Sequence, residues 1–129
     1  MSRLAIGVGC RRLCAAEAIL VLIARACEGL NTTGATLFTI ESKRDEAGLL
    51  EAANRLHLPL MFLSIDLLRD ALPRAISHST RVEAAMGLSS VAEPAALVGA
   101  GAGSRLVVPR LAGGGATCAV AVPFVAGRS

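Results

Sequence analysis

The chain has 129 residues, a length that suits one domain with a buried core. Its residues are 53% apolar but only 2% aromatic, with no Trp or Tyr, so the core must consist of Ala, Leu, Val and Ile. The net charge of +3 suits an anionic partner, but aromatic side chains for base stacking and a polycationic face are both missing, which excludes nucleic acid as the expected partner.

No apolar stretch is long and uninterrupted enough for a transmembrane helix, which needs about 20 residues. In the first helical segment only residues 18–24 lie free of charges, and the charge-free stretch 111–127 is broken by glycines and Pro123. Arg11 and Arg12 stand where a signal peptide would have to remain apolar. We therefore expect a cytoplasmic protein with no membrane partner.

The cysteines do not form a pattern typical of a metal site or of a disulfide framework. In the cytoplasm the four thiols, at positions 10, 14, 27 and 118, are expected to stay reduced. Cys10 and Cys14 have no second close pair and no nearby histidine, which a zinc site would require. We therefore predict no metal ion and no cofactor.

The first half of the chain alternates between apolar runs and segments with helical spacing. Residues 3–9 are apolar with little alternation, as in a strand that is covered on both faces. The next helix is expected over 14–28, and its apolar residues surround most of its circumference, so it packs deeply and offers a contact for a homodimer. Strands are expected at 35–40 and 60–63, with a helix at 45–57 between them.

The second half predicts short helices followed by two strands. The helices are expected at 64–72, 78–86 and 89–100, and the strands at 105–109 and 116–122. Because these two strands are close in the chain, they favour an antiparallel hairpin. The element order therefore predicts a single α/β domain over residues 1–129, with three layers (α/β/α) and a mostly parallel five-stranded sheet that ends in a C-terminal antiparallel hairpin.

In an open parallel sheet, ligands bind beyond the carboxyl ends of the strands. Charged, hydroxyl-bearing and small residues follow the expected strand ends or stand near the start of the last long helix. We call them the predicted rim, a set of candidate ligand-binding residues: Gly9, Cys10, Arg11, Lys43, Arg44, Asp45, Glu46, Ser64, Ser89, Ser90, Glu93 and Arg110. Among these, Cys10, Lys43 and Glu46 are the candidates for acid–base or nucleophilic catalysis, and no reaction is assigned to them.

Several rim residues also have structural interpretations. Gly7 and Gly9 form a Gly-x-Gly sequence that suits a turn in which the backbone approaches a ligand. Arg12 replaces the third glycine of a dinucleotide-binding motif, which argues against that ligand. Cys10 is either a small buried residue or a thiolate whose pKa is lowered by the next helix and by Arg11.

The charged rim residues have alternatives as well. The two adjacent arginines are either solvated or paired with carboxylates of a ligand. The run 43–46 is either a binding segment or a solvated turn in which Asp45 caps the following helix. Ser90 and Glu93 have the spacing of a capping box.

Five segments, in the same order, resemble the CobE and CbiG C-terminal family of cobalamin biosynthesis. They are GVGCRR (7–12), TIESKRDEAGLL (39–50), LPL (58–60), GLSSVAEPAAL (87–97) and ATCAVA (116–121). The chain departs from the family at Leu13-Cys14, where the family often has Gly-Thr or Gly-Ser and thus a hydroxyl cap for the helix. It also has Arg110 where a lysine is common, which keeps the positive charge but changes the shape of the charged group.

The resemblance implies a role in cobalamin biosynthesis. Longer relatives carry this domain behind others, in a cobalt-precorrin lactone hydrolase that opens a ring and releases acetaldehyde; this chain has no such part, so that activity is not expected here. The resemblance instead implies binding of a corrin or precorrin intermediate, a macrocycle whose many carboxylates would pair with Arg11, Lys43, Arg44 and Arg110. Two alternatives stay open: a small enzyme acting on a precorrin, and a protein that docks on another enzyme of the pathway through its apolar first helix.

Overall fold

The computed structural model describes residues 3–71 and 91–124, and within them the strands form one five-stranded sheet of order β3-β2-β1-β5-β4. The strands are β1 (Ala5–Cys10), β2 (Thr36–Ile40), β3 (Leu60–Leu63), β4 (Arg105–Gly113) and β5 (Ala116–Val122). β1, β2 and β3 are parallel, and β5 is antiparallel to both β1 and β4. Four strands therefore point the same way and only β5 is reversed, which confirms the predicted α/β class and the C-terminal hairpin.

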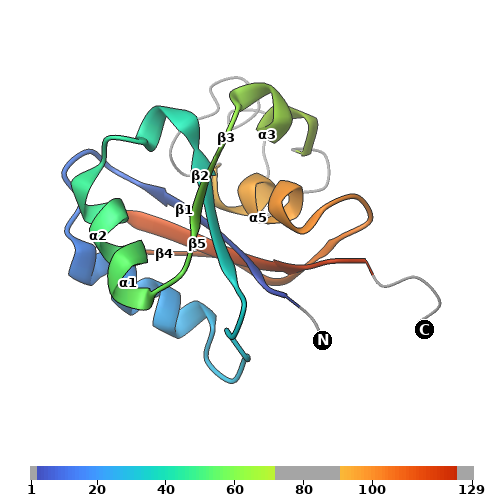
Figure 1. Cartoon of the computed structure of the whole chain (residues 1–129), viewed down its shortest axis with the longest axis horizontal. Helices are drawn as coiled ribbons and strands as arrows, with labels where there is room; N and C mark the ends of the chain where they lie inside the picture. The colour runs from blue at the N-terminus through green and yellow to red at the C-terminus, as the bar shows by residue number, and fades with distance from the viewer. Residues whose placement is uncertain (1–2, 72–90, 125–129) are drawn as a thin grey trace.

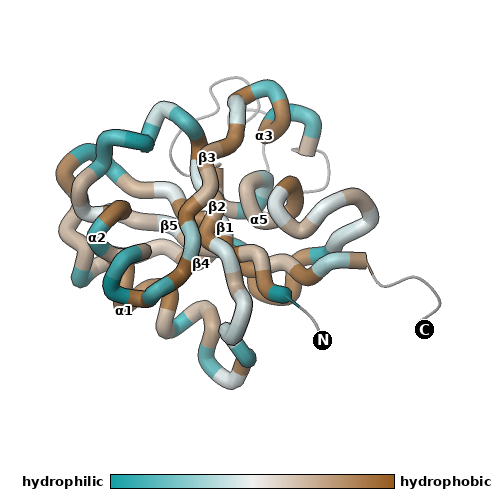
Figure 2. The backbone as a smooth tube through the Cα atoms, viewed as in Figure 1, coloured by the Kyte–Doolittle hydropathy of each residue, from teal (hydrophilic) through white to brown (hydrophobic). Residues whose placement is uncertain are grey.

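The helices cover both faces of the sheet, which confirms the three layers. α1 (Ala16–Ala26) and α2 (Ala47–Leu56) lie on one face, and α3 (Ile65–Ala71) and α5 (Ala92–Ala100) lie on the other (Figure 1). A short 3-10 helix, η1 (Glu41–Lys43), connects β2 to α2. Hydrophobic residues dominate the strands, whereas hydrophilic residues gather at the η1 turn and on α2 and α3 (Figure 2).

The two faces of β1 are packed in different ways. On the side of α1 and α2, the side chains of Ile6, Val8 and Cys10 are fully buried in the larger core cluster. On the other side, the main chain of α5 lies directly on the strand, because a Cβ at Gly7 would overlap the carbonyl oxygen of Ala92. Gly7 is therefore required by helix packing, and the close approach it allows is to α5.

The prediction that the Gly-x-Gly sequence forms a turn is thus wrong. Both Gly7 and Gly9 belong to β1, where they pair with Ala119 and Thr117 of β5. β1 continues to Cys10, and the chain turns only in the next three residues. A glycine pair that looks flexible in isolation is held extended by strands and a helix that are distant in the chain.

β4 is longer than predicted and contains Arg110, which therefore does not follow a strand end. Two register shifts in its pairing with β5 let the strand continue past Pro109. The hairpin turn consists of Gly114 and Gly115, with φ angles of 62° and 89°, a conformation that two-residue hairpins favour. The loop expected at 110–115 thus shrinks to two residues.

The helices are shorter than expected at their ends. α1 begins at Ala16 instead of residue 14, and α2 begins at Ala47 instead of residue 45, because a turn at residues 44–45 follows η1. The helix expected at 78–86 and the rim residues Ser89 and Ser90 lie outside the described residues.

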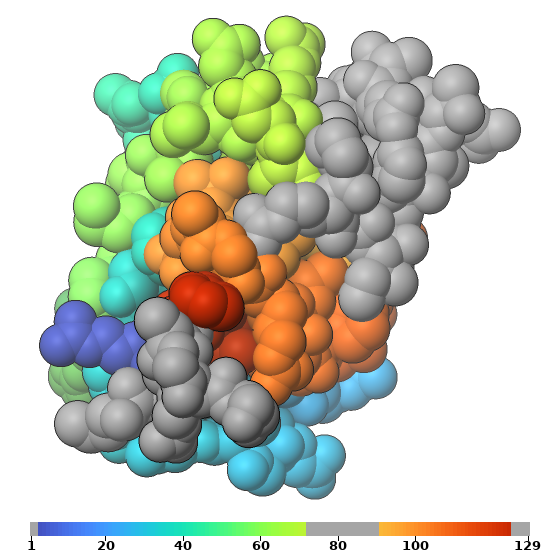
Figure 3. Space-filling view, turned by 90° about the vertical axis from the view of Figure 1, so that its right-hand side faces the viewer, coloured from blue at the N-terminus to red at the C-terminus, as the bar shows by residue number. Residues whose placement is uncertain are grey.

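Across the described ranges, no helix reaches the length and apolar character needed to cross a membrane. Figure 3 shows the end of the molecule where β1 begins and β5 ends, with the segment between α5 and β4 (orange) packed around the end of β5 (red). Of the predicted rim, residues 9–11 and 43–46 lie at the opposite end of the sheet, where β1 and β2 end.

Candidate functional site

An open pocket of about 720 Å³ lies where β1 and β2 end, between the starts of α1 and α2. We call it the α1–α2 pocket. Its lining comprises residues 12–17, Ser42, Lys43, residues 45–48 and Glu51. The pocket is thus formed by the turn after β1, the first turn of α1, the η1 segment and the first turn of α2.

Both helices that border the pocket begin without a side-chain cap. The N-cap residues are Ala15 for α1 and Glu46 for α2, and neither makes a side-chain capping hydrogen bond. The prediction that Asp45 caps α2 is therefore wrong. The first N–H groups of an α-helix have no partner within the helix, and they carry a partial positive charge. Two such helix starts open on the same pocket.

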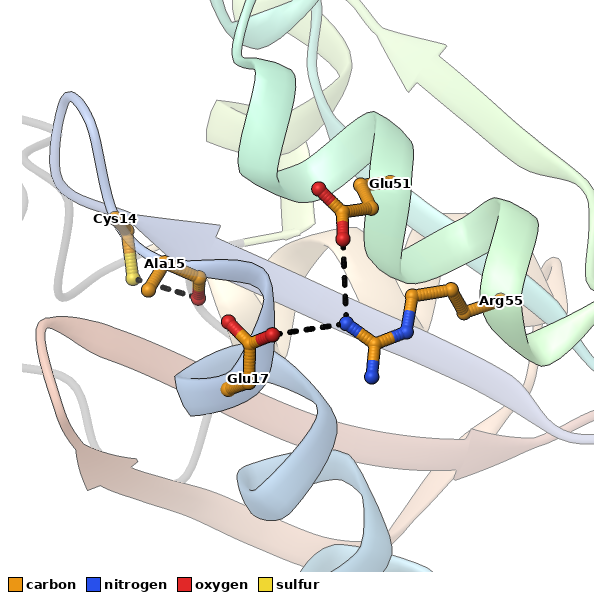
Figure 4. A network of polar contacts seen from close by, with 5 residues as sticks. All are labelled: Cys14, Ala15, Glu17, Glu51 and Arg55. Carbon is orange, nitrogen blue, oxygen red and sulfur yellow. Dashed lines mark hydrogen bonds and ion pairs between the residues drawn. The ribbon is translucent and has the colours of Figure 1, made fainter.

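The two helices are joined at the pocket by main-chain packing and by an ion-pair network. A Cβ at Gly48 would overlap the carbonyl oxygen of Cys14, so α2 touches the turn before α1 directly. The Arg55 guanidinium lies 3.0 Å from the Glu17 carboxylate of α1 and 3.2 Å from the Glu51 carboxylate of α2 (Figure 4). The pKa of Glu17 is lowered by a hydrogen bond from its own backbone N–H and by Arg55.

A hydrogen bond joins the turn after β1 to the start of α2. The Leu13 N–H donates to a carboxylate oxygen of Glu46 at 2.9 Å. Leu13 has a left-handed backbone with φ of 62°, and its side chain is 91% exposed. This left-handed conformation is the one that glycine adopts most readily.

Cys10 ends β1, close enough to the pocket residues Lys43 and Glu46 for their charges to act on its thiol. It is fully buried, and burial raises its pKa to about 11, an effect that Lys43 only partly offsets. Burial therefore favours the interpretation of Cys10 as a small buried residue over that of a thiolate whose pKa is lowered by the helix and by Arg11. Burial and the Glu46 carboxylate also raise the pKa of Cys14, whose Sγ donates to the carbonyl oxygen of Gly114 at 3.5 Å.

The structure brings three of the predicted rim residues together in the pocket, namely Lys43, Asp45 and Glu46. Arg11 is not among the lining residues, and its backbone N–H donates to the carbonyl oxygen of Gly115 at 2.8 Å. Arg44 is turned to its own segment: its Nε donates to the carbonyl oxygen of Glu41 at 3.2 Å.

The remaining described rim residues have structural contacts elsewhere. The Ser64 hydroxyl accepts a hydrogen bond from the Leu67 N–H at 3.3 Å and so caps α3. Glu93, buried at the start of α5, accepts a hydrogen bond from the Arg110 N–H at 2.9 Å on the other face of the sheet. Gly9 is buried within β1.

The structure adds residues that the predicted rim did not include. Arg12 and Leu13 line the pocket. The sequence indicated Arg12 as one of two adjacent arginines that could pair with ligand carboxylates, but it gave no sign that Leu13 belongs to a site. Thr117 of β5 is 7% exposed, and its hydroxyl oxygen is buried without a hydrogen-bond partner. It lies opposite Gly9, and a hydroxyl in an otherwise apolar strand was its signal. Over the two described ranges, no three His, Cys, Asp or Glu side chains are grouped to hold a metal ion.

Comparison with known proteins identifies the family. The model of the family described as "Cobalamin synthesis G C-terminus" matches residues 4–121. Protein CobE from a Sinorhizobium species is 32% identical over 123 residues, which cover 93% of this chain and 80% of the relative.

Solved structures agree in fold and sequence. The crystal structure of CobE, a protein from the cobalamin (vitamin B12) biosynthetic pathway, has a TM-score of 0.83 and 37% identity, covering 95% of this chain and 92% of that chain. Cobalamin biosynthesis protein chiG from Agrobacterium tumefaciens has a TM-score of 0.73 and 36% identity, with coverages of 95% and 99%.

A more distant structure supports the fold alone. A putative cobalamin biosynthesis protein G homolog from Sulfolobus solfataricus has a TM-score of 0.73 at 20% identity, and the match covers 95% of this chain but 37% of that one. The extent of the family match and the identity to CobE are sufficient for an assignment: the chain belongs to the cobalamin synthesis G C-terminus family and is a protein of cobalamin biosynthesis.

Proposed function

We propose that this protein binds a corrin or precorrin intermediate at the α1–α2 pocket, with carboxylates of the ligand directed at the starts of both helices. The observation that carries the proposal is the convergence of two helix starts without side-chain caps on one pocket that Arg12 and Lys43 also line. In a family of cobalamin biosynthesis, the ligand with matching chemistry is a macrocycle rich in carboxylates.

The electrostatics of the pocket support an anionic ligand. Backbone N–H groups at a helix start donate to anions, and the helix dipole adds to the attraction. Arg12 and Lys43 supply full positive charges for charge-assisted hydrogen bonds. Four carboxylates also line the pocket. Those of Glu17 and Glu51 are paired with Arg55 and that of Glu46 accepts the Leu13 N–H, which reduces their repulsion of an incoming anion, whereas Asp45 opposes it.

The size of the pocket is compatible with one side of a macrocycle. Small-molecule sites occupy about 300–1,000 Å³, and this open pocket has about 720 Å³. The ligand would place one edge in the pocket and leave the rest accessible, an arrangement suited to a carrier that passes an intermediate between cytoplasmic enzymes. The burial of Cys10 argues against that residue as a nucleophile, so an enzymatic role would rest on Lys43 or Glu46.

A docking role is the second candidate, and a specific surface favours it. A groove of about 310 Å³ runs between α1 and the hairpin tip, lined by Glu17, Ala18, Val21, Leu22, Arg25, Gly113 and Gly114. The Val21 side chain is 60% exposed there. Sedimentation of the protein alone and with enzymes of the pathway would reveal a homodimer or a complex, and Val21→Asp should abolish either one.

The binding proposal is tested by absorbance titration with cobyrinic acid, a corrin that carries carboxylate side chains. The corresponding corrin with amidated side chains is the matched control ligand. We expect binding of the carboxylate form at micromolar protein, weakened by salt and by Arg12→Gln or Lys43→Gln, each by about fivefold to tenfold. Arg69→Gln, at an exposed position of α3, is the control variant and should bind as the parent does. The proposal fails if no spectral shift occurs or if the amidated form binds equally well.

A further inference from the structure

We propose that Leu13 is a specificity-determining contact of the α1–α2 pocket: its side chain packs against the apolar face of the ligand macrocycle. The site then selects ligands that combine an apolar face with carboxylates over small carboxylates that offer charge alone. This inference rests on the proposed function, because it assigns a role within the same pocket.

The exposure of Leu13 sets it apart from the other apolar residues. At 91% it is the most exposed large apolar side chain in the described part of the chain, ahead of Phe124 at 64% and Val21 at 60%. Isolated surface leucines are ordinary. This one, however, lines a pocket and follows directly after Arg12, so apolar surface and positive charge are offered side by side.

The backbone at Leu13 is unfavourable for a leucine. Its φ of 62° lies in the left-handed region, which a side chain with a Cβ enters at a cost, and which glycine and asparagine tolerate better. Strained backbones of this kind gather at ligand sites, where the surrounding structure maintains them. A leucine with no internal packing partner gains nothing from this position in the free protein.

The surrounding contacts hold the leucine in place before any ligand arrives. Its N–H is bound by the Glu46 carboxylate at 2.9 Å. The Arg11 N–H donates to the carbonyl oxygen of Gly115 at 2.8 Å, and the Cys14 N–H donates to the carbonyl oxygen of Arg11 at 3.1 Å. Because the turn is fixed at these points, contact with Leu13 costs little additional ordering.

The experiment compares Leu13 variants of similar size that differ in apolar surface. Leu13→Asn keeps the approximate shape and tolerates the left-handed conformation, but it removes the apolar surface. Its affinity for cobyrinic acid should fall about tenfold, as expected for the loss of a partly buried leucine contact. Leu13→Met keeps the apolar surface and should bind within about twofold of the parent. Citrate serves as the small carboxylate probe, and its weak binding should be the same in all variants.

Two further variants separate ligand contact from backbone effects. His57→Asn changes the other described non-glycine residue with a left-handed backbone, at φ 57° and outside the pocket lining, and should leave affinity unchanged. Leu13→Gly also suits the left-handed backbone and removes the side chain, so its affinity for cobyrinic acid should fall as that of Leu13→Asn does. If one of the two variants folds poorly, the other still tests the inference.

Parental affinity in both Leu13→Asn and Leu13→Gly would overturn the role of Leu13 and leave the proposed function intact. Failure of the parent protein to bind cobyrinic acid would overturn both. Loss of affinity in both variants with Leu13→Met and His57→Asn unaffected would support the inference.

Discussion

The carboxylate of Glu46 binds the backbone N–H of Leu13 at 2.9 Å, although 33 positions separate the two residues in the chain. The bond joins the turn that follows β1 to the residue that precedes α2. Since both residues line the α1–α2 pocket, one side chain fixes the relative position of two of its walls. Glu46, considered as a catalytic or binding group, thus has a defined role in shaping the pocket.

Replacing Glu46 by alanine should lower the free energy of unfolding by about 1 kcal/mol, because the Leu13 N–H loses a hydrogen bond to a charged group. The site is exposed, so a water molecule can replace part of that hydrogen bond. Denaturant unfolding measures this loss, and amide hydrogen exchange should show faster exchange at Leu13. Glu46→Gln keeps an acceptor and should retain most of the stability. Equal exchange rates at Leu13 in the parent and the alanine variant would contradict the bond.

Replacing Thr117 by valine should stabilise the protein by about 1 kcal/mol, because it removes a buried hydroxyl that has no partner and keeps the shape of the side chain. Thr39 is the matched control: its buried hydroxyl donates to the Val8 carbonyl oxygen at 2.7 Å. Thr39→Val should therefore destabilise the protein by a similar amount. Thermal unfolding of both variants tests the pair, and a loss of stability in Thr117→Val would show that its hydroxyl is bound.

The free energy of unfolding should decrease as the pH rises above about 9. Burial raises the pKa of Cys10 from 9.0 to about 11, so between these values the folded chain keeps a proton that the unfolded chain has released. Stability falls with pH wherever the folded state binds more protons, by up to about 1.4 kcal/mol per pH unit for one thiol. Below pH 9 both states are protonated, and this contribution is constant.

Denaturant unfolding between pH 7 and 10 measures how steeply the free energy of unfolding falls with pH. Cys10→Ala should make this fall shallower, even if the variant is less stable overall. In the folded parent, Cys10 should also react slowly with thiol reagents at pH 8, because its thiolate is scarce and the residue is buried. Rapid modification of Cys10 under these conditions would restore it as a candidate nucleophile.

Replacing Gly7 by alanine should destabilise the protein by about 3 kcal/mol or more, because the added methyl group overlaps the main chain of α5 at Ala92. Gly29→Ala is the comparison: a Cβ there meets nothing within 4 Å, and only its φ of 78° opposes the change. That variant should lose about 1 kcal/mol. Similar losses in the two variants would mean that α5 does not rest on β1 as described.

Local sequence signals predicted some elements with the observed bounds and failed for others. The strands at 60–63 and 116–122 were correct because each is an apolar run bordered by residues that interrupt it. The end of β4 was misplaced because Pro109 looked like a terminus, whereas pairing with β5 carries the strand to Gly113. The position of β5 between β1 and β4 depends on long-range pairing, which no local pattern contains.

The residues of the candidate site were also predicted from the sequence only in part. Lys43, Asp45 and Glu46 were predicted because charge gathers after a buried strand, and the pocket includes all of them. Leu13 was noted only as a departure from the related family, because neither its backbone angle nor its exposure is visible in a sequence. Arg110 was assigned to the rim because the strand was expected to end at Pro109, whereas β4 continues to Gly113.

The position of β5 beside β1 also sets an order for folding. Ala5 pairs with Ala121, so the first strand of the sheet obtains one of its two neighbours from residues more than a hundred positions away. While the chain is being synthesised, β1 can pair with β2 but must keep its other edge open until β5 has emerged from the ribosome. Contacts of such long range slow folding, and an open central edge invites pairing with other chains. Chains cut before β5 are therefore expected to aggregate, even though every residue that lines the α1–α2 pocket precedes the cut.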